Sequence, residues 1–234
     1  AVDASLDQLE RVEETEVIGL AASAGPCSAR IERGRTLREG KTAAGPVPPP
    51  LPVAGRWKLI AEGVRFARRE LVMEQLVPWG EREELRFFSG TGTYELDLDL
   101  PGTYVSPDVE VILDLGRVGD VAEVFWNERP VGVCWMEPYR LAVTRYLRPG
   151  VNRLRVMVTN TLIHHIAGLR EPPPVPAELV PHYGEEFTEY RLGRDAFFKR
   201  DRLFRPLPPS GLIGPVRLVA WRRIRIPMQP AKTV

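Results

Sequence analysis

Four carboxylates close together in the sequence are the residues best suited to acid–base chemistry: Glu185, Glu186, Glu189 and Asp195. Hydrolysis of a glycosidic bond needs two carboxyl groups that face one bond across a cleft. All four stand in a Pro-rich segment that predicts a loop, where acidic side chains are usually solvated. We therefore assign no catalytic residue from the sequence.

The histidines offer little to a metal ion. His164 and His165 are adjacent, so on a strand they would point to opposite faces, and His182 is the third. No cysteine pair with ligand spacing accompanies them. The sequence also lacks a nucleophile elbow, a phosphate loop and a dinucleotide fingerprint. We expect neither a metal nor a cofactor.

Carbohydrate recognition has more candidates. A pyranose ring presents an apolar C–H face and a rim of hydroxyls, so it needs an aromatic platform and planar polar groups. The residues that could supply these at one end of a domain are Trp135, Tyr139, Asn160, His164, Arg170 and Tyr190. The alternative for Trp135 and Tyr139 is that they only pack in the core.

The composition argues against partners that are recognised by bulk charge. The 234 residues carry 32 basic and 31 acidic side chains, for a net charge of +1. This balance gives no case for nucleic acid or a membrane surface, and no apolar run is long enough to span a bilayer. Cys27 and Cys134 are predicted to be two separate buried thiols, with one long-range disulfide as the alternative. The sequence indicates no compartment.

The elements that position these residues are clearest at 93–100. Apolar residues occupy every second position from Tyr94 to Leu100 and alternate with acids, which is typical of a strand with one buried face. Further strands are predicted at 56–62, 109–115, 121–126, 131–135, 139–143, 151–159 and 216–226. The predicted core includes Leu96, Leu113, Val124, Leu154, Val156 and Leu218. The pattern favours an all-β fold, an antiparallel β-sandwich of the jelly-roll type.

Several connections are also predicted. Residues 126–130 indicate a hairpin turn, and 144–150 indicate a single helical turn that Thr144 caps. Residues 6–16 have weak helical spacing, and 64–78 are interpreted as loop with a helical turn. A long aromatic and Pro-rich insertion at 160–211 is expected to be ordered and to lie against the sandwich, because disordered segments are poor in aromatics.

Composition divides the chain into three parts. Residues 1–50 contain strands at 17–22 and 28–31, too few to bury a core alone, and end in a Pro-rich linker. We interpret this short N-terminal β-rich segment as the tail of a preceding domain. Residues 51–228 form the sandwich, and 229–234 are a C-terminal tail.

An ordered succession of segments carries a family resemblance. They are 55–59, 88–94 (Phe-Ser-Gly-Thr-Gly-Thr-Tyr), 113–116, 121–124, 131–132, 138–140, 147–154, 156–160 and 209–216. Together they resemble the C-terminal sandwich of family 106 glycoside hydrolases, the α-L-rhamnosidases, and more loosely the sugar-binding domain of family 2 glycosidases. The resemblance implies a galactose-binding-like sandwich, with the catalytic carboxylates in an upstream barrel domain of the same polypeptide. The first residue, Ala1 rather than Met, agrees with a piece of a longer protein.

The resulting hypothesis is a non-catalytic accessory or sugar-binding domain of a rhamnosidase-like glycoside hydrolase. Its expected partners are carbohydrate and the upstream catalytic domain, which it would brace and to whose substrate cleft it would lend a loop. The alternative is a structural or protein-interaction β-sandwich without carbohydrate affinity. An independent glycosidase comes third.

Overall fold

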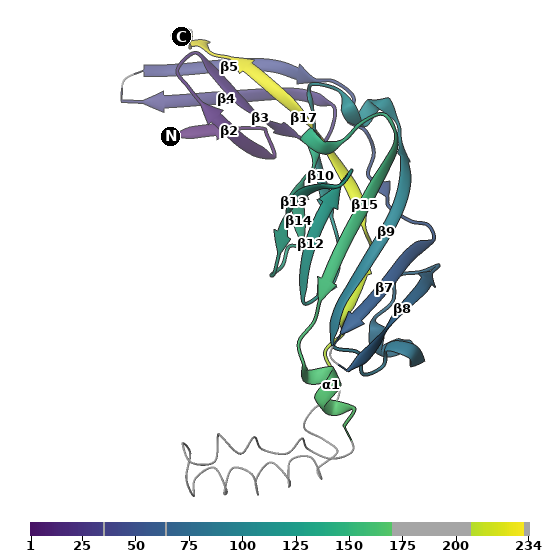
Figure 1. Cartoon of the computed structure of the whole chain (residues 1–234). Helices are drawn as coiled ribbons and strands as arrows, with labels where there is room; N and C mark the ends of the chain where they lie inside the picture. Colours follow the sequence, from purple (N-terminus) through teal and green to yellow (C-terminus); the bar gives the residue numbers. More distant parts are fainter. Residues whose placement is uncertain (35, 64, 170–206, 232–234) are drawn as a thin grey trace, which may run out of the picture.

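Antiparallel strands make up most of the architecture in the computed structural model (Figure 1). The structure describes residues 1–34, 36–63, 65–169 and 207–231. Within these residues the strands form four sheets, two of them six-stranded, and the single α-helix is α1 (Ile163–Ala167). The prediction of an all-β, antiparallel sandwich is confirmed.

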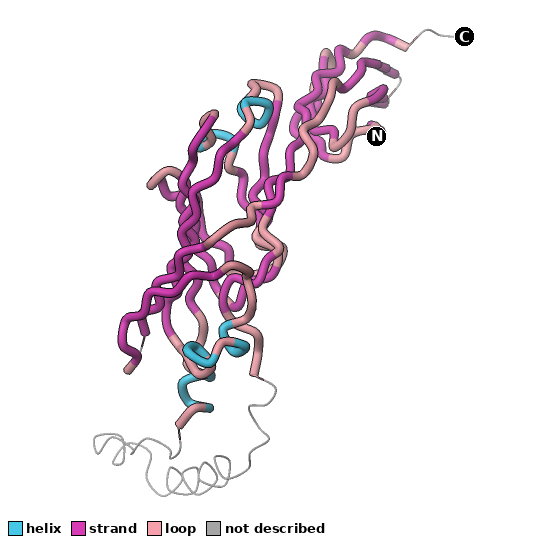
Figure 2. Tube along the Cα trace, turned by 90° about the vertical axis from the view of Figure 1, so that its right-hand side faces the viewer, coloured by secondary structure: helices cyan, strands magenta, loops and turns pink. Residues whose placement is uncertain are grey.

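Two sheets form the sandwich, and Figure 2 shows them from the side. One sheet has the order β13 (Arg129–Cys134), β12 (Val121–Trp126), β15 (Gly150–Thr159), β9 (Gly90–Leu100), β7 (Trp57–Gly63) and β8 (Phe66–Met73). The other has the order β14 (Arg140–Ala142), β10 (Val109–Asp114), β17 (Arg217–Pro227), β3 (Glu16–Ala21) and β2 (Gln8–Val12), and β6 (Leu51–Pro52) also pairs with β17. A large core lies between them.

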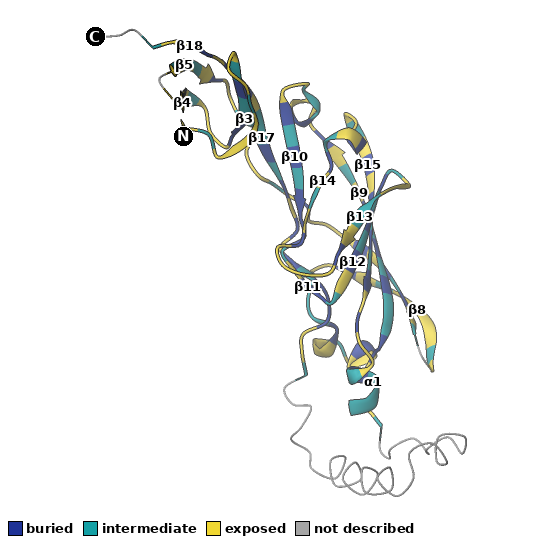
Figure 3. Cartoon of the chain, turned by 90° about the vertical axis from the view of Figure 1, so that its left-hand side faces the viewer, coloured by how far each residue is buried: buried dark blue, intermediate teal, exposed yellow. Residues whose placement is uncertain are grey.

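The pairing of β9 with β15 shows how the sequence sets the register. It runs from Leu100 opposite Gly150 to Thr91 opposite Thr159. Along β9 the predicted alternation is observed, with Tyr94 and Leu100 buried and the acids between them on the outer side (Figure 3). A slip of one residue would bury those acids, so this register is strongly specified.

Two hydrophobic cores lie along the molecule, and β17 contributes to both. Leu218 belongs to the larger core of the sandwich, whereas Ile224 and Ile226 belong to the smaller one. Around the smaller core lies the sheet β1 (Val2–Ala4), β4 (Gly25–Arg33), β5 (Thr36–Ala44) and β18 (Gln229–Pro230). The six predicted core residues, Leu96, Leu113, Val124, Leu154, Val156 and Leu218, are all buried in the larger core, which confirms that prediction.

The cysteines are divided between these cores. Cys27 lies in the smaller core and Cys134 in the larger one, and both are buried thiols without a disulfide. The prediction of two separate buried thiols is confirmed. In the part of the chain that the structure describes, no helix has the length and apolar character needed to cross a membrane.

The hairpin at 126–130 is also confirmed. Asn127 and Glu128 join β12 to β13 with φ values of 50° and 63°. Positive φ at both central residues is the requirement of the tight turn that matches the twist of paired strands. Asn127 reinforces the turn, because its side-chain oxygen accepts a hydrogen bond from the Arg153 amide at 2.9 Å.

Two predictions of local structure were wrong. Residues 66–73 form strand β8 rather than loop with a helical turn, and residues 8–12 form strand β2 rather than weak helix. Both are edge strands, and most of their residues are exposed or half-buried. Exposure on both faces removes the apolar alternation by which strands are recognised, and charges on an edge discourage pairing with other chains.

Thr144 does not cap the short helix that it was expected to cap. The helical turn Thr144–Tyr146 has no side-chain cap, although its existence was predicted correctly. The Thr144 hydroxyl instead accepts a hydrogen bond from the Val111 amide at 2.8 Å and donates one to Glu110 at 2.6 Å. Thr144 therefore ties this turn to β10, a tertiary contact that a local pattern does not reveal.

The Pro-rich stretch after β5 lies against the sandwich. Leu51 and Pro52 pair with β17, and the Val53 amide donates to the Val216 carbonyl at 2.9 Å. The Tyr104 hydroxyl donates to the Pro49 carbonyl, and the Arg222 guanidinium donates to the Pro46 carbonyl. These contacts hold the extended segment along one side of the domain.

Candidate functional site

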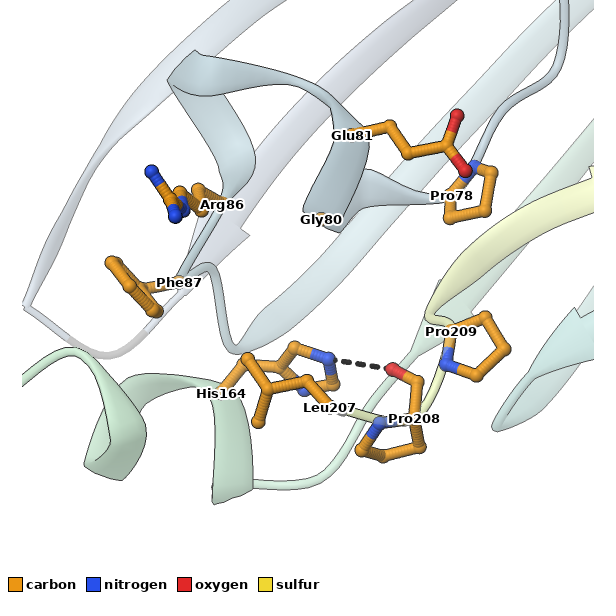
Figure 4. Close-up of a pocket in the computed structure, with 9 residues that line it drawn as sticks. All are labelled: Pro78, Gly80, Glu81, Arg86, Phe87, His164, Leu207, Pro208 and Pro209. Carbon is orange, nitrogen blue, oxygen red and sulfur yellow. Dashed lines mark hydrogen bonds between the residues drawn. The ribbon is translucent and has the colours of Figure 1, made fainter. Parts of the chain in front are cut away.

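A concave surface lies at one end of the sandwich, beside α1 (Figure 4). It has a volume of about 340 Å³ and is lined by Pro78, Gly80, Glu81, Arg86, Phe87, His164, Leu207, Pro208 and Pro209. We call it the α1-end cleft. One wall is the segment of two 3₁₀ turns, Trp79–Glu81 and Glu83–Leu85. The other is α1 with the chain that enters β16 (Gly211–Gly214), the partner of β11 (Arg117–Gly119).

The first wall is anchored by Trp79. Its indole N–H donates to the Tyr94 hydroxyl at 2.6 Å, and its amide donates to the Ser210 carbonyl at 2.9 Å. The Leu212 amide donates to the same Tyr94 oxygen at 3.1 Å. Burial of Tyr94 raises its pKa to about 12, so this hydroxyl is neutral and accepts two hydrogen bonds in the core. The 3₁₀ segment is thereby fixed to both β9 and β16.

Hydrogen bonds of the Asn160 and His164 side chains hold the second wall in place. The Asn160 side chain accepts from the Gly90 amide and donates to the Phe88 carbonyl, both at 2.9 Å. His164 Nε2 lies 2.9 Å from the Pro208 carbonyl, and Nδ1 lies 3.4 Å from Asn160 Nδ2. A carbonyl only accepts, so we assign the ring proton to Nε2 and leave Nδ1 to accept from Asn160. Both ring nitrogens therefore hold the wall in place.

A second set of hydrogen bonds connects α1 to the neighbouring loop. The Ser89 hydroxyl donates to the Thr161 carbonyl and accepts from the His165 amide, both at 2.9 Å. The Thr161 amide donates to the Asp120 carboxylate at 3.2 Å, and the Tyr139 hydroxyl donates to the Asp120 carbonyl at 3.0 Å. Burial, with help from the nearby Asp120 charge, raises the pKa of Tyr139. Tyr139 is therefore a neutral, buried side chain that is tied to the Asp120 backbone by its hydroxyl.

Three side chains remain that present groups to the cleft: Glu81, Arg86 and Phe87. Figure 4 shows Arg86 and Phe87 toward one end of the first wall and Glu81 toward its other end. The Arg86 guanidinium lies 5.5 Å from the centroid of the Phe87 ring and 4.0 Å from the Glu83 carboxylate. Among the described residues, Glu81 makes no ion pair. The cleft therefore offers an aromatic ring, a donor group and an acceptor group.

Backbone packing fixes the aromatic ring. A Cβ atom added at Gly168, just after α1, would lie 2.7 Å from Cβ and Cγ of Phe87. Phe87 therefore rests directly on the backbone at Gly168, and only a residue without a side chain allows this approach. Phe87 as a whole remains 37% exposed, so the residue is accessible although it is fixed.

The structure brings two of the predicted sugar-binding residues together. Asn160 and His164 are both buried and lie beside the cleft. Trp135 is 69% exposed in the loop after β13 and is not among the residues of the cleft. Arg170 and Tyr190 lie outside the described residues, as do His182, the carboxylates Glu185, Glu186, Glu189 and Asp195, and most of the 160–211 insertion.

The sequence analysis missed Glu81, Arg86 and Phe87. Glu81 ends one 3₁₀ turn and Arg86 and Phe87 follow the next, and in such irregular segments no period distinguishes a residue that lines a cleft from any other exposed residue. The adjacent phenylalanines Phe87 and Phe88 were the sequence feature that could have drawn attention to this segment. In the structure only Phe88 is buried, and Phe87 is left for the cleft. In the described part of the chain, no group of three or more His, Cys, Asp or Glu residues has a metal-binding arrangement.

The chain is similar to parts of longer known proteins. No family model matches the chain. It is 30% identical over 193 residues to a putative β-glucuronidase of Formosa agariphila, a match that covers 76% of this chain and 16% of that protein. The solved rhamnosidase of Novosphingobium sp. PP1Y matches 94% of this chain and 25% of its own, with a TM-score of 0.55 and 21% identity.

These matches bear on the fold and on the size of the relatives. The likeness to the rhamnosidase shows a shared β-domain fold. The chain spans 16% of the length of the curated relative that it matches. Both proteins carry the names of glycoside hydrolases.

Proposed function

We propose that this chain serves as the accessory β-sandwich domain of a glycoside hydrolase of the rhamnosidase-like kind. The observation that carries the proposal is the 30% identity over 193 residues to a protein named as a glucuronidase, of which the match covers only 16%. A match confined to a small part of a long enzyme is expected for a supporting domain. The sandwich then braces the catalytic domain of the same polypeptide, and its cleft meets carbohydrate.

The proposed role is a non-catalytic one. Glycosidases place two carboxyl groups about 5–10 Å apart on either side of the scissile bond. Among the described residues, Glu81 is the single carboxylate that lines the α1-end cleft. A lone exposed carboxylate can accept hydrogen bonds from hydroxyls. It cannot supply the two groups of a glycosidase, which are a general acid and either a general base or a nucleophile.

The proposed division of the chain has a physical basis in the smaller core. Residues 1–50 would be the tail of a preceding domain and its linker, and 51–228 the sandwich, followed by a short tail; β3 and β2 of the tail extend one sheet of the sandwich by pairing onto β17. The smaller core combines Val17, Cys27 and Ile31 from the N-terminal strands with Ile224 and Ile226 from β17. The N-terminal strands thus depend on β17 to bury their apolar faces, which supports the view that they do not form a domain alone.

A protein-interaction role is the second candidate, and the end of β13 favours it. Val133, Trp135 and Met136 are 55%, 69% and 58% exposed, and Val121 on the neighbouring strand is 37% exposed. Large exposed apolar residues that cluster in this way are typical of contact surfaces. In the accessory-domain proposal, the same surface is available to the catalytic domain.

The bracing role is tested on the protein encoded by the complete reading frame. Deletion of 51–228 should lower the melting temperature of the remaining protein and reduce its turnover of nitrophenyl α-L-rhamnoside or nitrophenyl β-D-glucuronide. As a matched control, Val151→Ala alters a residue of the sandwich that is 61% exposed and should change neither quantity. If the truncated protein kept its full melting temperature and rate, bracing would be refuted.

A further inference from the structure

We propose that the α1-end cleft is a binding site for one neutral pyranose ring. In this site the Phe87 ring lies against the apolar face of the sugar, and Arg86 and Glu81 exchange hydrogen bonds with its hydroxyls. The inference rests on the proposed function, because it names the site and the ligand class through which the domain meets carbohydrate. It moves the aromatic platform from Trp135, which the sequence suggested, to Phe87.

The dimensions of the cleft suit one ring. Its volume of about 340 Å³ lies near the lower end of the range of roughly 300–1,000 Å³ that small-molecule sites occupy. Pro78, Pro208 and Pro209 add flat apolar surfaces around the aromatic ring. Such a site accepts a monosaccharide unit.

The polar groups suit hydroxyls better than a charged ligand. A vicinal diol both donates and accepts, so it is matched by a guanidinium on one side and a carboxylate on the other. A uronate carboxylate would find the Arg86 charge but would also face Glu81, with Glu83 4.0 Å from Arg86. Among the described residues, these two acids against one base disfavour an anion in this position. The charge balance therefore selects a neutral sugar.

The cleft is organised before any ligand arrives. Trp79 is fully buried and holds the segment that carries Glu81, while His164 holds Pro208 on the opposite wall. Phe87 is held by its contact with the backbone at Gly168. A preformed aromatic platform avoids much of the ordering cost that weakens sugar binding. One open wall nevertheless limits the affinity to the millimolar range, because it cannot enclose the ring.

The experiment titrates the 234-residue chain with methyl α-L-rhamnoside, methyl β-D-glucoside and glucuronate, and follows amide resonances by NMR. At least one neutral glycoside should shift the amides of Gly80, Phe87 and Gly168 in a saturable way, and glucuronate should bind more weakly. Phe87→Ala should weaken binding about tenfold, as expected for the loss of one aromatic contact. Glu81→Gln should weaken it by a smaller factor, because an amide keeps one acceptor.

Trp135→Ala is the matched control, since it removes a larger and more exposed aromatic residue outside the cleft. It should leave the affinity unchanged. The inference is overturned if no neutral glycoside binds, if glucuronate binds more tightly, or if Trp135→Ala abolishes binding while Phe87→Ala does not. A further outcome is that the 234-residue chain binds no sugar while the complete protein still loses stability and turnover when residues 51–228 are deleted. That pair of results would refute this inference alone and leave the accessory role standing.

Discussion

Replacement of Tyr94 by Phe removes one oxygen atom that anchors the wall of the cleft. This oxygen accepts from the Trp79 indole at 2.6 Å and from the Leu212 amide at 3.1 Å, and both Tyr94 and Trp79 have no exposed surface. A buried donor that loses its partner costs about 1–3 kcal/mol. With two donors affected, we expect Tyr94→Phe to lower the free energy of unfolding by about 2–5 kcal/mol.

Urea unfolding followed by circular dichroism measures this loss. The midpoint should fall without a change in slope, because the fold and the surface exposed on unfolding remain the same. Phe keeps the ring and its packing against Trp57, whose centroid lies 6.3 Å from that of Tyr94, so the substitution isolates the hydroxyl. A loss below about 0.5 kcal/mol would refute the assignment of two buried hydrogen bonds to this oxygen.

The alkaline pH dependence gives a second measurement on the same pair. Tyr94 ionises near pH 10 when unfolded but has a pKa of about 12 in the native state. The native state therefore retains a proton that the unfolded state releases, and stability falls as pH rises from about 10 to about 12. The full loss is about 3 kcal/mol, of which about 1 kcal/mol is reached near pH 11. Tyr94→Phe should lack this part of the slope, so equal slopes for both proteins would contradict the reasoning.

Three further substitutions probe the core, the ion pairs and the cleft. Leu96→Ala in the predicted core should cost about 2–5 kcal/mol in denaturant unfolding, and a negligible cost would show that the register is wrong. Asp114→Asn should cost about 1–3 kcal/mol at neutral pH, because it breaks the pairs of a buried carboxylate with two arginines that are themselves half exposed. Burial raises the Asp114 pKa, but hydrogen bonds to the carboxylate outweigh burial and lower the pKa below its usual value. The difference in unfolding free energy between the native sequence and Asp114→Asn should therefore shrink as pH falls below about 4. A difference that stays constant in acid would contradict this. Gly168→Ala should displace Phe87 and weaken glycoside binding in the NMR titration, and unchanged binding would mean that Phe87 does not need its packing on Gly168.

The architecture could be predicted from the sequence where one face of a strand is buried. Strand β9 illustrates this, since its alternation fixed both the strand and the residues that enter the core. Strands β8 and β2 could not be recognised, because edge strands expose both faces and carry charges on each. The fold was therefore most predictable at its centre and least predictable at its edges.

The candidate site was less predictable for a related reason. Asn160 and His164 were identified as polar residues at the end of a strand, and the structure places them together. Their hydrogen bonds join segments far apart in sequence, such as His164 to Pro208, and no local pattern encodes such a pairing. The open groups of the cleft, Glu81 and Phe87, stand on turns whose orientation depends on the burial of Trp79. Whether the six proposed residues contact sugar stays a prediction.

The central claim is that this chain supports a glycoside hydrolase without being one, and a turnover measurement tests it most directly. The 234-residue chain and the protein of the complete reading frame are each incubated with nitrophenyl α-L-rhamnoside and nitrophenyl β-D-glucuronide, and nitrophenol release is followed. The account predicts release by the complete protein and none by the chain alone. Release by the chain alone that Glu186→Gln abolishes, or a complete protein that hydrolyses neither substrate, would contradict it.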